Sequence, residues 1–254
     1  FFGNSPYMYG ANNPVMFVDF DGRDYGIYIN HAKKTIEIRS HYIVNNNDSK
    51  LMNEIASYWN GQSGNFVYAI GEGADAESYA VNFNITVEID NSMAKVDGSD
   101  FLTAGYTRAQ EGRKNNPTSN EINSLVTTAD HFLFKRDEKK EGVTGGNDAL
   151  IKSTSTRKKN TGKHETGHNM GMSHTSSLMD PTGGDSVTKR SIGETLGKVG
   201  LGIPKKGDSA GEGAIGSING VTGMAPVNFT AGTVVTQQSF ERKKNRAIKR
   251  ANKN

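Results

Sequence analysis

The chain has 254 residues, which is enough for one catalytic domain with a hydrophobic core and short for two. It contains no cysteine, which excludes disulfide bonds, thiolate metal ligands and a thiol nucleophile, and no stretch approaches the roughly 18 consecutive apolar residues of a transmembrane helix. The net charge of +3 is uneven, because the last fourteen residues hold seven Lys/Arg and one Glu.

Residues 7–24 contain a short sequence pattern that is also found in other proteins. The run Tyr-Met-Tyr-Gly-Ala-Asn-Asn-Pro is followed by Asp19-Phe20-Asp21-Gly22. It resembles the end of an Rhs-repeat core, in which Tyr-x-Tyr-x-x-Asn-Asn-Pro leads to an Asp-Pro-x-Gly boundary before a variable C-terminal toxin domain. In this chain Phe20 occupies the position that is usually proline in that boundary. The resemblance implies that residues 1–24 are the end of an Rhs-like core or a linker, in a fragment of a longer protein.

The next segments predict a small sheet and a helix. Alternating residues from Ile36 to Val44 have the period of a half-buried strand, and Gly26 to Asn30 could pair with it as a hairpin. Asp48 or Ser49 could cap a helix with an apolar face from Leu51 to Trp59, which would end near Gly61.

Two further strands are expected over residues 66–70 and 79–89, the second with apolar residues at six odd positions. Residues 105–120 show no pattern, and residues 125–128 and 132–134 are short apolar runs that fit a strand or a helix. Gly142 to Asn147 is expected to form a glycine-rich turn before the apolar residues 149–151.

The last third of the sequence is expected to be largely irregular. From Thr182 to Gly232, Gly, Ser and Thr dominate, with a helix expected only near Ser191, and we assign residues 182–235 to an irregular insertion. Thr236 could cap a final helix over residues 236–252, in which Phe240, Ala247, Ile248 and Ala251 share one face and basic residues occupy the rest.

The segment His164-Glu165-Thr166-Gly167-His168-Asn169-Met170-Gly171-Met172-Ser173-His174 carries the chemistry. On a helix, His164 and His168 leave the same face one turn apart and could bind a single ion. Gly171 could end that helix with a positive φ and return the chain, so that His174 becomes a third ligand. Three imidazoles and a water are typical of catalytic zinc.

Glu165 follows the first histidine, about 100° around the helix, which puts its carboxylate beside the metal as a base and not as a ligand. The sequence therefore predicts one catalytic Zn²⁺ held by His164, His168 and His174, with Glu165 as the catalytic residue. His31, His41 and His131 have no partner at ligand spacing and are assigned ordinary structural roles.

Ser177-Leu178-Met179-Asp180-Pro181 resembles the Met-turn of the metzincins, which puts a methionine beneath the metal. Together with the HExxHxxGxxH pattern, it makes the chain similar to these zinc metallopeptidases. The resemblance implies an α+β fold with a mixed twisted sheet, a packing helix, a zinc-binding helix, a Met-turn at Met179 and a C-terminal helix, within one domain over residues 25–254. It also implies that the strand before the zinc helix, Leu150 to Ser153, lines the cleft and binds substrate.

The expected function is therefore zinc-dependent endopeptidase activity on proteins or peptides. The Rhs resemblance implies a toxin effector that is secreted or delivered into a target cell as part of a larger bacterial protein, with the Rhs shell and a cognate immunity protein as partners. Two alternatives remain: a toxin directed at nucleic acid through the basic tail, and a non-catalytic zinc-containing binding module. We do not expect nucleic acid as a partner, because a basic run is usually one solvated helix face.

Overall fold

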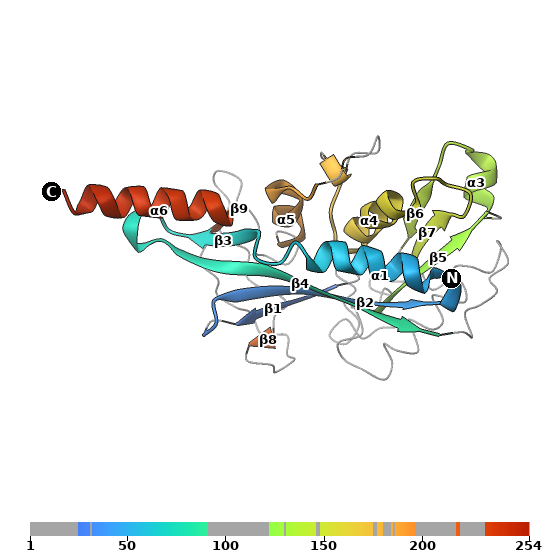
Figure 1. The fold of residues 1–254 in the computed structure, drawn as a ribbon, viewed down its shortest axis with the longest axis horizontal. Helices are drawn as coiled ribbons and strands as arrows, with labels where there is room; N and C mark the ends of the chain where they lie inside the picture. Colours follow the sequence, from blue (N-terminus) through green and yellow to red (C-terminus); the bar gives the residue numbers. More distant parts are fainter. Residues whose placement is uncertain are drawn as a thin grey trace, which may run out of the picture.

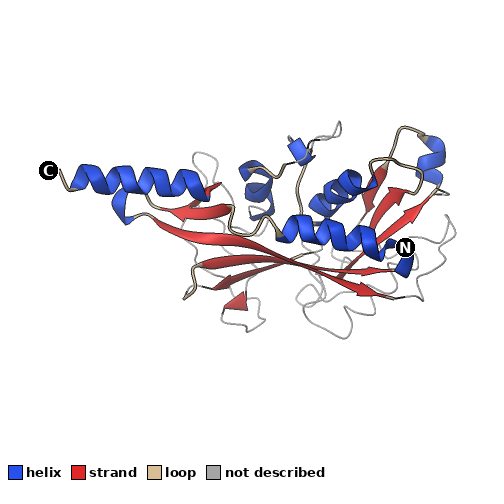
Figure 2. Cartoon of the chain, in the orientation of Figure 1, coloured by secondary structure: helices blue, strands red, loops and turns tan. Residues whose placement is uncertain are grey.

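The computed structural model describes residues 25–30, 32–90, 122–129, 131–145, 148–174, 177–179, 184, 186–196, 217–218 and 232–253. The Rhs-like segment 1–24, His31, the polar stretch 105–120 and most of residues 197–231 lie outside these ranges. Within them, nine strands form one mixed sheet that is accompanied by five α-helices (Figure 2). The α+β class expected from the sequence is thereby confirmed.

The main path of the sheet has the strand order β6-β7-β5-β2-β4-β3-β9. β1 pairs with β2 beside this path, and β8 pairs with β1. The strands are β1 (Gly26–Asn30), β2 (Thr35–Val44), β3 (Phe66–Ile70), β4 (Glu77–Ile89), β5 (Ile122–Thr128), β6 (Gly142–Gly145), β7 (Asp148–Lys152), β8 (Ser217–Ile218) and β9 (Gly232–Thr236). β2, β4, β5 and β7 are parallel where they pair, whereas β6 is antiparallel to β7.

β2 lies at the centre of the sheet, and its side chains alternate as the sequence predicts. Ile36, Ile38 and Tyr42 are buried, and the strand pairs with β4 along its whole length, from Thr35 opposite Ala80 to Val44 opposite Ile89. β1 forms the expected antiparallel hairpin with its first half. The predictions for β1, β2, β3 and β4 are therefore confirmed.

Helix α1 (Asn46–Asn60) packs on β2, β4 and β5 (Figure 1). Its cap differs from the prediction, because Asn45 and not Asp48 or Ser49 occupies the N-cap position. The Asn45 side chain accepts a hydrogen bond from the Asp48 amide and donates one to the Asp48 carboxylate. Asp48 also accepts hydrogen bonds from Thr127 of β5, so it ties the helix to the sheet.

The segment before the zinc-motif helix differs from the expectation in two respects. Residues 142–145, expected as part of a turn, form the edge strand β6. β7 has β5 on one side and β6 on the other, so the strand over residues 150–152 cannot accept an added substrate strand. Among the described strands, β6 forms the edge at this end of the sheet.

The remaining described elements are helical apart from the strands β8 and β9. α3 (Phe132–Arg136) follows β5, the 3₁₀ helix η1 (Gly73–Asp75) precedes β4, and α5 (Lys189–Leu196) is the helix expected near Ser191. β9 was not predicted; it pairs antiparallel with β3 at the other end of the sheet. α6 (Gln237–Ala251) follows with Thr236 as its N-cap, as predicted. Among the described residues, no helix combines the length and apolar character that a membrane crossing requires.

Candidate metal centre

Helix α4 (Lys158–Asn169) carries the zinc motif and lies on the sheet beside α1. Gly162 allows the two helices to approach closely, since a Cβ atom there would lie 2.3 Å from Cδ1 of Ile55 in α1. At its other end, the buried Asn169 side chain accepts a hydrogen bond of 2.9 Å from the Tyr42 hydroxyl of β2. The helix is therefore fixed to the core on both sides of its histidines.

The rings of His164 and His168 are oriented by backbone carbonyls. Nδ1 of His164 lies 2.8 Å from the carbonyl oxygen of Leu178, and Nδ1 of His168 lies 2.8 Å from that of Met172. A carbonyl oxygen only accepts, so each Nδ1 carries the proton and each Nε2 of a neutral ring presents its lone pair. Gly171 has a φ of 80°, and this left-handed residue returns the chain after α4 as the sequence predicts.

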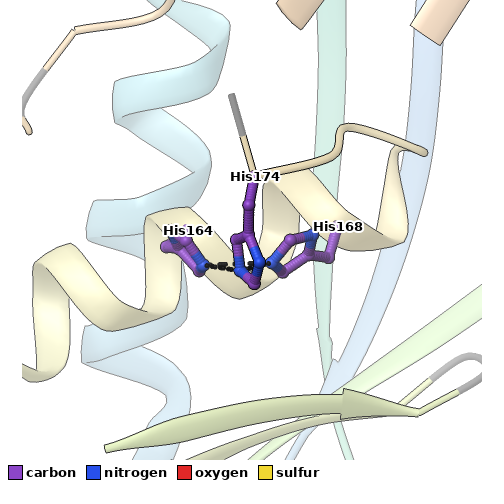
Figure 3. A group of neighbouring side chains, drawn as sticks. All are labelled: His164, His168 and His174. Carbon is purple, nitrogen blue, oxygen red and sulfur yellow. Dashed lines mark hydrogen bonds between the residues drawn. The ribbon is translucent and has the colours of Figure 1, made fainter. Parts of the chain in front are cut away.

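The third histidine completes a compact group of nitrogen atoms. The three Nε2 atoms of His164, His168 and His174 lie 2.9–3.1 Å from one another (Figure 3). Lone pairs on the first two rings face each other at 3.0 Å, which is unfavourable unless a proton or a cation lies between them. Three imidazole nitrogens around one point suit Zn²⁺, so the donor set fits the expected metal.

The loop that carries His174 is anchored by a residue that sequence reasoning missed. The backbone amide of Ser173 donates a hydrogen bond of 3.0 Å to Oε2 of Glu194 in α5. Oε1 of the same carboxylate lies 3.5 Å from Nε of Arg190, one turn earlier in the helix. Glu194, twenty residues after His174, thereby connects the loop of the third histidine to α5, and no local sequence pattern signals this contact.

Met179 packs against the helix that carries the zinc motif. It lies in the 3₁₀ helix η4 (Ser177–Met179) and is fully buried. A Cβ atom at Gly167 would lie 2.5 Å from the Met179 sulfur, so the methionine packs directly on α4 between the two histidines of the helix. The preceding residue supplies the carbonyl that orients His164. The segment thus both supports and orients the candidate ligands.

Glu165 is turned towards the edge strand. Its Oε2 accepts a hydrogen bond of 2.6 Å from the Thr144 hydroxyl, and a Cβ atom at Gly142 would lie 2.5 Å from its Oε1. The side chain is buried, and burial raises the pKa of its carboxyl to about 7, although the Thr144 hydrogen bond and the charge of Lys140 act in the opposite direction. The carboxyl is thus able to exchange a proton near neutral pH.

The structure brings together the three predicted histidine ligands; Glu165 lies on the helix that carries two of them, and Met179 packs against that helix. His41 lies on β2 and contacts Thr86 and Glu88, whereas His131 is the buried N-cap of α3. Neither belongs to a metal-binding cluster in the described part of the chain. Thr144 was missed, although a β-branched pair between glycines at 143–144 could have indicated a short strand.

Comparison with known proteins adds no family assignment: no protein-family model matches the chain, and no curated protein is detectably similar to it.

Proposed function

We propose that the chain is a zinc-dependent endopeptidase of the metzincin type. The convergence of three imidazole Nε2 atoms within 2.9–3.1 Å carries this proposal. A buried carboxyl on the same helix and a buried methionine beneath it provide further support. A purely structural zinc site would normally close its fourth position with a protein ligand, whereas the described residues supply three.

His164, His168 and His174 would hold the ion, which when bound polarises a carbonyl and makes water more acidic. The catalytic role of the chain itself falls to Glu165. Its carboxylate accepts a proton from the attacking water and then donates that proton to the leaving amine, and Thr144 holds it in the orientation for both transfers. The buried environment of this carboxyl favours its protonated form, which is the form that the second transfer requires.

The substrate would bind along β6. This strand is the edge of the sheet next to α4, and its partner on the other side is β7. An extended peptide could therefore pair, by backbone hydrogen bonds, with the side of β6 that no described strand occupies. Since Thr144 of β6 bonds to Glu165, a peptide bound there would run close to the general base.

The test is metal content by mass spectrometry together with cleavage of a mixed peptide library. Wild type should contain one zinc per chain and cleave peptides. Glu165→Gln should retain the metal and lose at least about 10²-fold in rate. Glu138→Gln, which changes an exposed carboxylate between α3 and β6, is the matched control and should behave as wild type. Zinc without cleavage that depends on Glu165 would favour a binding module, and absence of metal would refute the proposal.

Delivery as a toxin is a separate proposal that rests on residues 7–24. It predicts an Rhs-repeat shell upstream in the full gene and a small neighbouring gene whose product binds this domain. A co-purification with that product tests the partner, and a gene without an upstream repeat shell would refute the delivery proposal while leaving the zinc site untouched.

A further inference from the structure

In the described part of the structure, the contacts that hold the C-terminal helix α6 to the body come from its first half. Phe240 is buried with Val67 and Ala76, and the Lys244 ammonium donates a hydrogen bond of 2.8 Å to the Ala76 carbonyl. The helix contacts η1, β3 and β9, and its C-terminal part projects beyond the sheet, at the end of the molecule opposite α3 (Figure 1).

The opposite face of α6 is strongly basic. At about 100° per residue, five cationic side chains of α6 fall within an arc of about 120°, and Lys253, two residues past the end of the helix, adds a sixth cation. All six are exposed: Arg242, Lys243, Arg246, Lys249, Arg250 and Lys253. We call this set the basic face. Glu241 lies on another side of the helix and accepts a hydrogen bond from Gln237.

The basic face has no counter-charge in the described part of the chain, where none of its six side chains takes part in an ion pair or hydrogen bond. Like charges three and four residues apart repel one another on a helix, so this arrangement is unfavourable for α6 alone. The repulsion would be relieved by a partner with closely spaced negative charges.

We propose that the basic face of α6 is a docking surface for double-stranded DNA. The face extends over about 16 Å, and an α-helix of about 10–12 Å in diameter fits the DNA major groove, which is about 12 Å wide. Three of the six cations are arginines, which suit phosphate oxygens, and Asn245 and Asn252 border the face with further hydrogen-bonding groups.

An anionic membrane fits the same helix less well. A helix that lies in a membrane surface needs a row of exposed apolar side chains to insert. In α6 the phenylalanine is buried against the body, and Ile248, at 36% exposure, is the only large apolar residue that the described part of the helix exposes. From the sequence, nucleic acid was not expected as a partner. We infer it because the basic face is exposed and Phe240 is buried.

Nucleic acid bound to α6 would bring the domain to proteins that are themselves bound to nucleic acid. The docking surface does not depend on the zinc site, because the basic face lies on a different element. Its test does not depend on that site either, because it measures DNA binding and not peptide cleavage.

The experiment measures binding of the full chain to a short fluorescent DNA duplex of mixed sequence, by anisotropy, between about 0.05 and 0.2 M salt. Polyglutamate and vesicles of phosphatidylglycerol and phosphatidylcholine serve as competing polyanions. The test variant is Lys243→Gln/Lys249→Gln/Lys253→Gln. The matched control, Lys33→Gln/Lys139→Gln/Lys189→Gln, makes the same change in charge at three exposed lysines on other parts of the chain.

Wild type and the control should bind the duplex with a slope of log K against log salt near −5, the value for about six phosphate contacts. The α6 variant should show a slope near −3 and more than tenfold weaker binding at about 0.1 M salt. Equal binding by the two triple variants, or no duplex binding at about 0.05 M salt, would overturn the proposal. So would polyglutamate or vesicles that compete as well as unlabelled duplex, which would assign the face to an acidic protein or to a membrane.

Discussion

Packing of Met179 against Gly167 can be tested without any measurement of activity. A Cβ atom at Gly167 would lie 2.5 Å from the sulfur and 3.1 Å from Cε of Met179, both well inside van der Waals contact. Gly167→Ala should therefore cost about 1–3 kcal/mol in overpacking, of which about 1 kcal/mol is recovered because alanine favours the helix more than glycine. The expected net loss in unfolding free energy is about 0–2 kcal/mol.

Met179→Ala removes a fully buried side chain and should cost about 2–5 kcal/mol. In the double variant, the new Cβ at position 167 enters the space that Met179 leaves, so the clash disappears and the cavity shrinks. We therefore expect the double variant to be more stable than the sum of the single changes by about 1–2 kcal/mol.

Urea unfolding of the metal-free protein measures the four free energies, since chelation removes the contribution of metal binding to stability. The control cycle pairs Gly167→Ala with Met52→Ala, a buried methionine of α1 that is not among the atoms nearest to the Gly167 Cβ position. That cycle should be additive within about 0.5 kcal/mol. If the unfolding free energies in the Met179 cycle were additive within the same limit, Met179 would not support the helix at Gly167.

Three further outcomes are expected. Glu194→Ala should raise the dissociation constant for Zn²⁺ about tenfold, because it releases the Ser173 amide. Arg190→Ala should leave this constant unchanged. Equal effects of the two variants would mean that Glu194 does not position His174. Gly142→Ala should displace the Glu165 carboxyl and lower kcat at least about tenfold with zinc content unchanged, so an unaltered kcat would contradict the contact. Burial lowers the pKa of His131, so the unfolded chain binds more protons and unfolding free energy should fall as pH drops below about 6.5. This loss should be smaller in His131→Asn, in urea titrations at several pH values.

The candidate site could be predicted from the sequence because its ligands lie within eleven residues. His164, His168 and Gly171 are related by helix geometry alone, and the left-handed conformation of Gly171 follows from the need to reverse the chain. The same holds for β2 and β4, whose alternating side chains reflect burial of one face. In each case the relevant physical interaction is local or repeats with a fixed period.

The features that sequence reasoning missed depend on contacts between distant residues. β6 has two glycines in four residues, and glycine ordinarily indicates a turn, but Gly142 is required because the Glu165 carboxyl fills the space of its side chain. Likewise, the four β-branched residues of β9 suit a strand, but so short a run becomes one because β3 offers it an edge. Asn45 caps α1 because the helix begins at Asn46, and Asp48, in the first turn, bonds to both the Asn45 side chain and Thr127 of β5.

The position of Glu165 explains why the motif helix must lie beside an edge strand. A glutamate on the solvent face of α4 would be ionised and free to rotate, whereas this one is buried between the helix and β6 and held by Thr144. Burial against a strand interior to the sheet would leave no room for a peptide, because both strand edges would already be paired. An edge strand satisfies both requirements: β6 pairs with β7 on one side, and no described strand pairs with its other side, where a peptide could be added. The orientation of the candidate base and the candidate substrate edge are therefore consequences of a single packing arrangement.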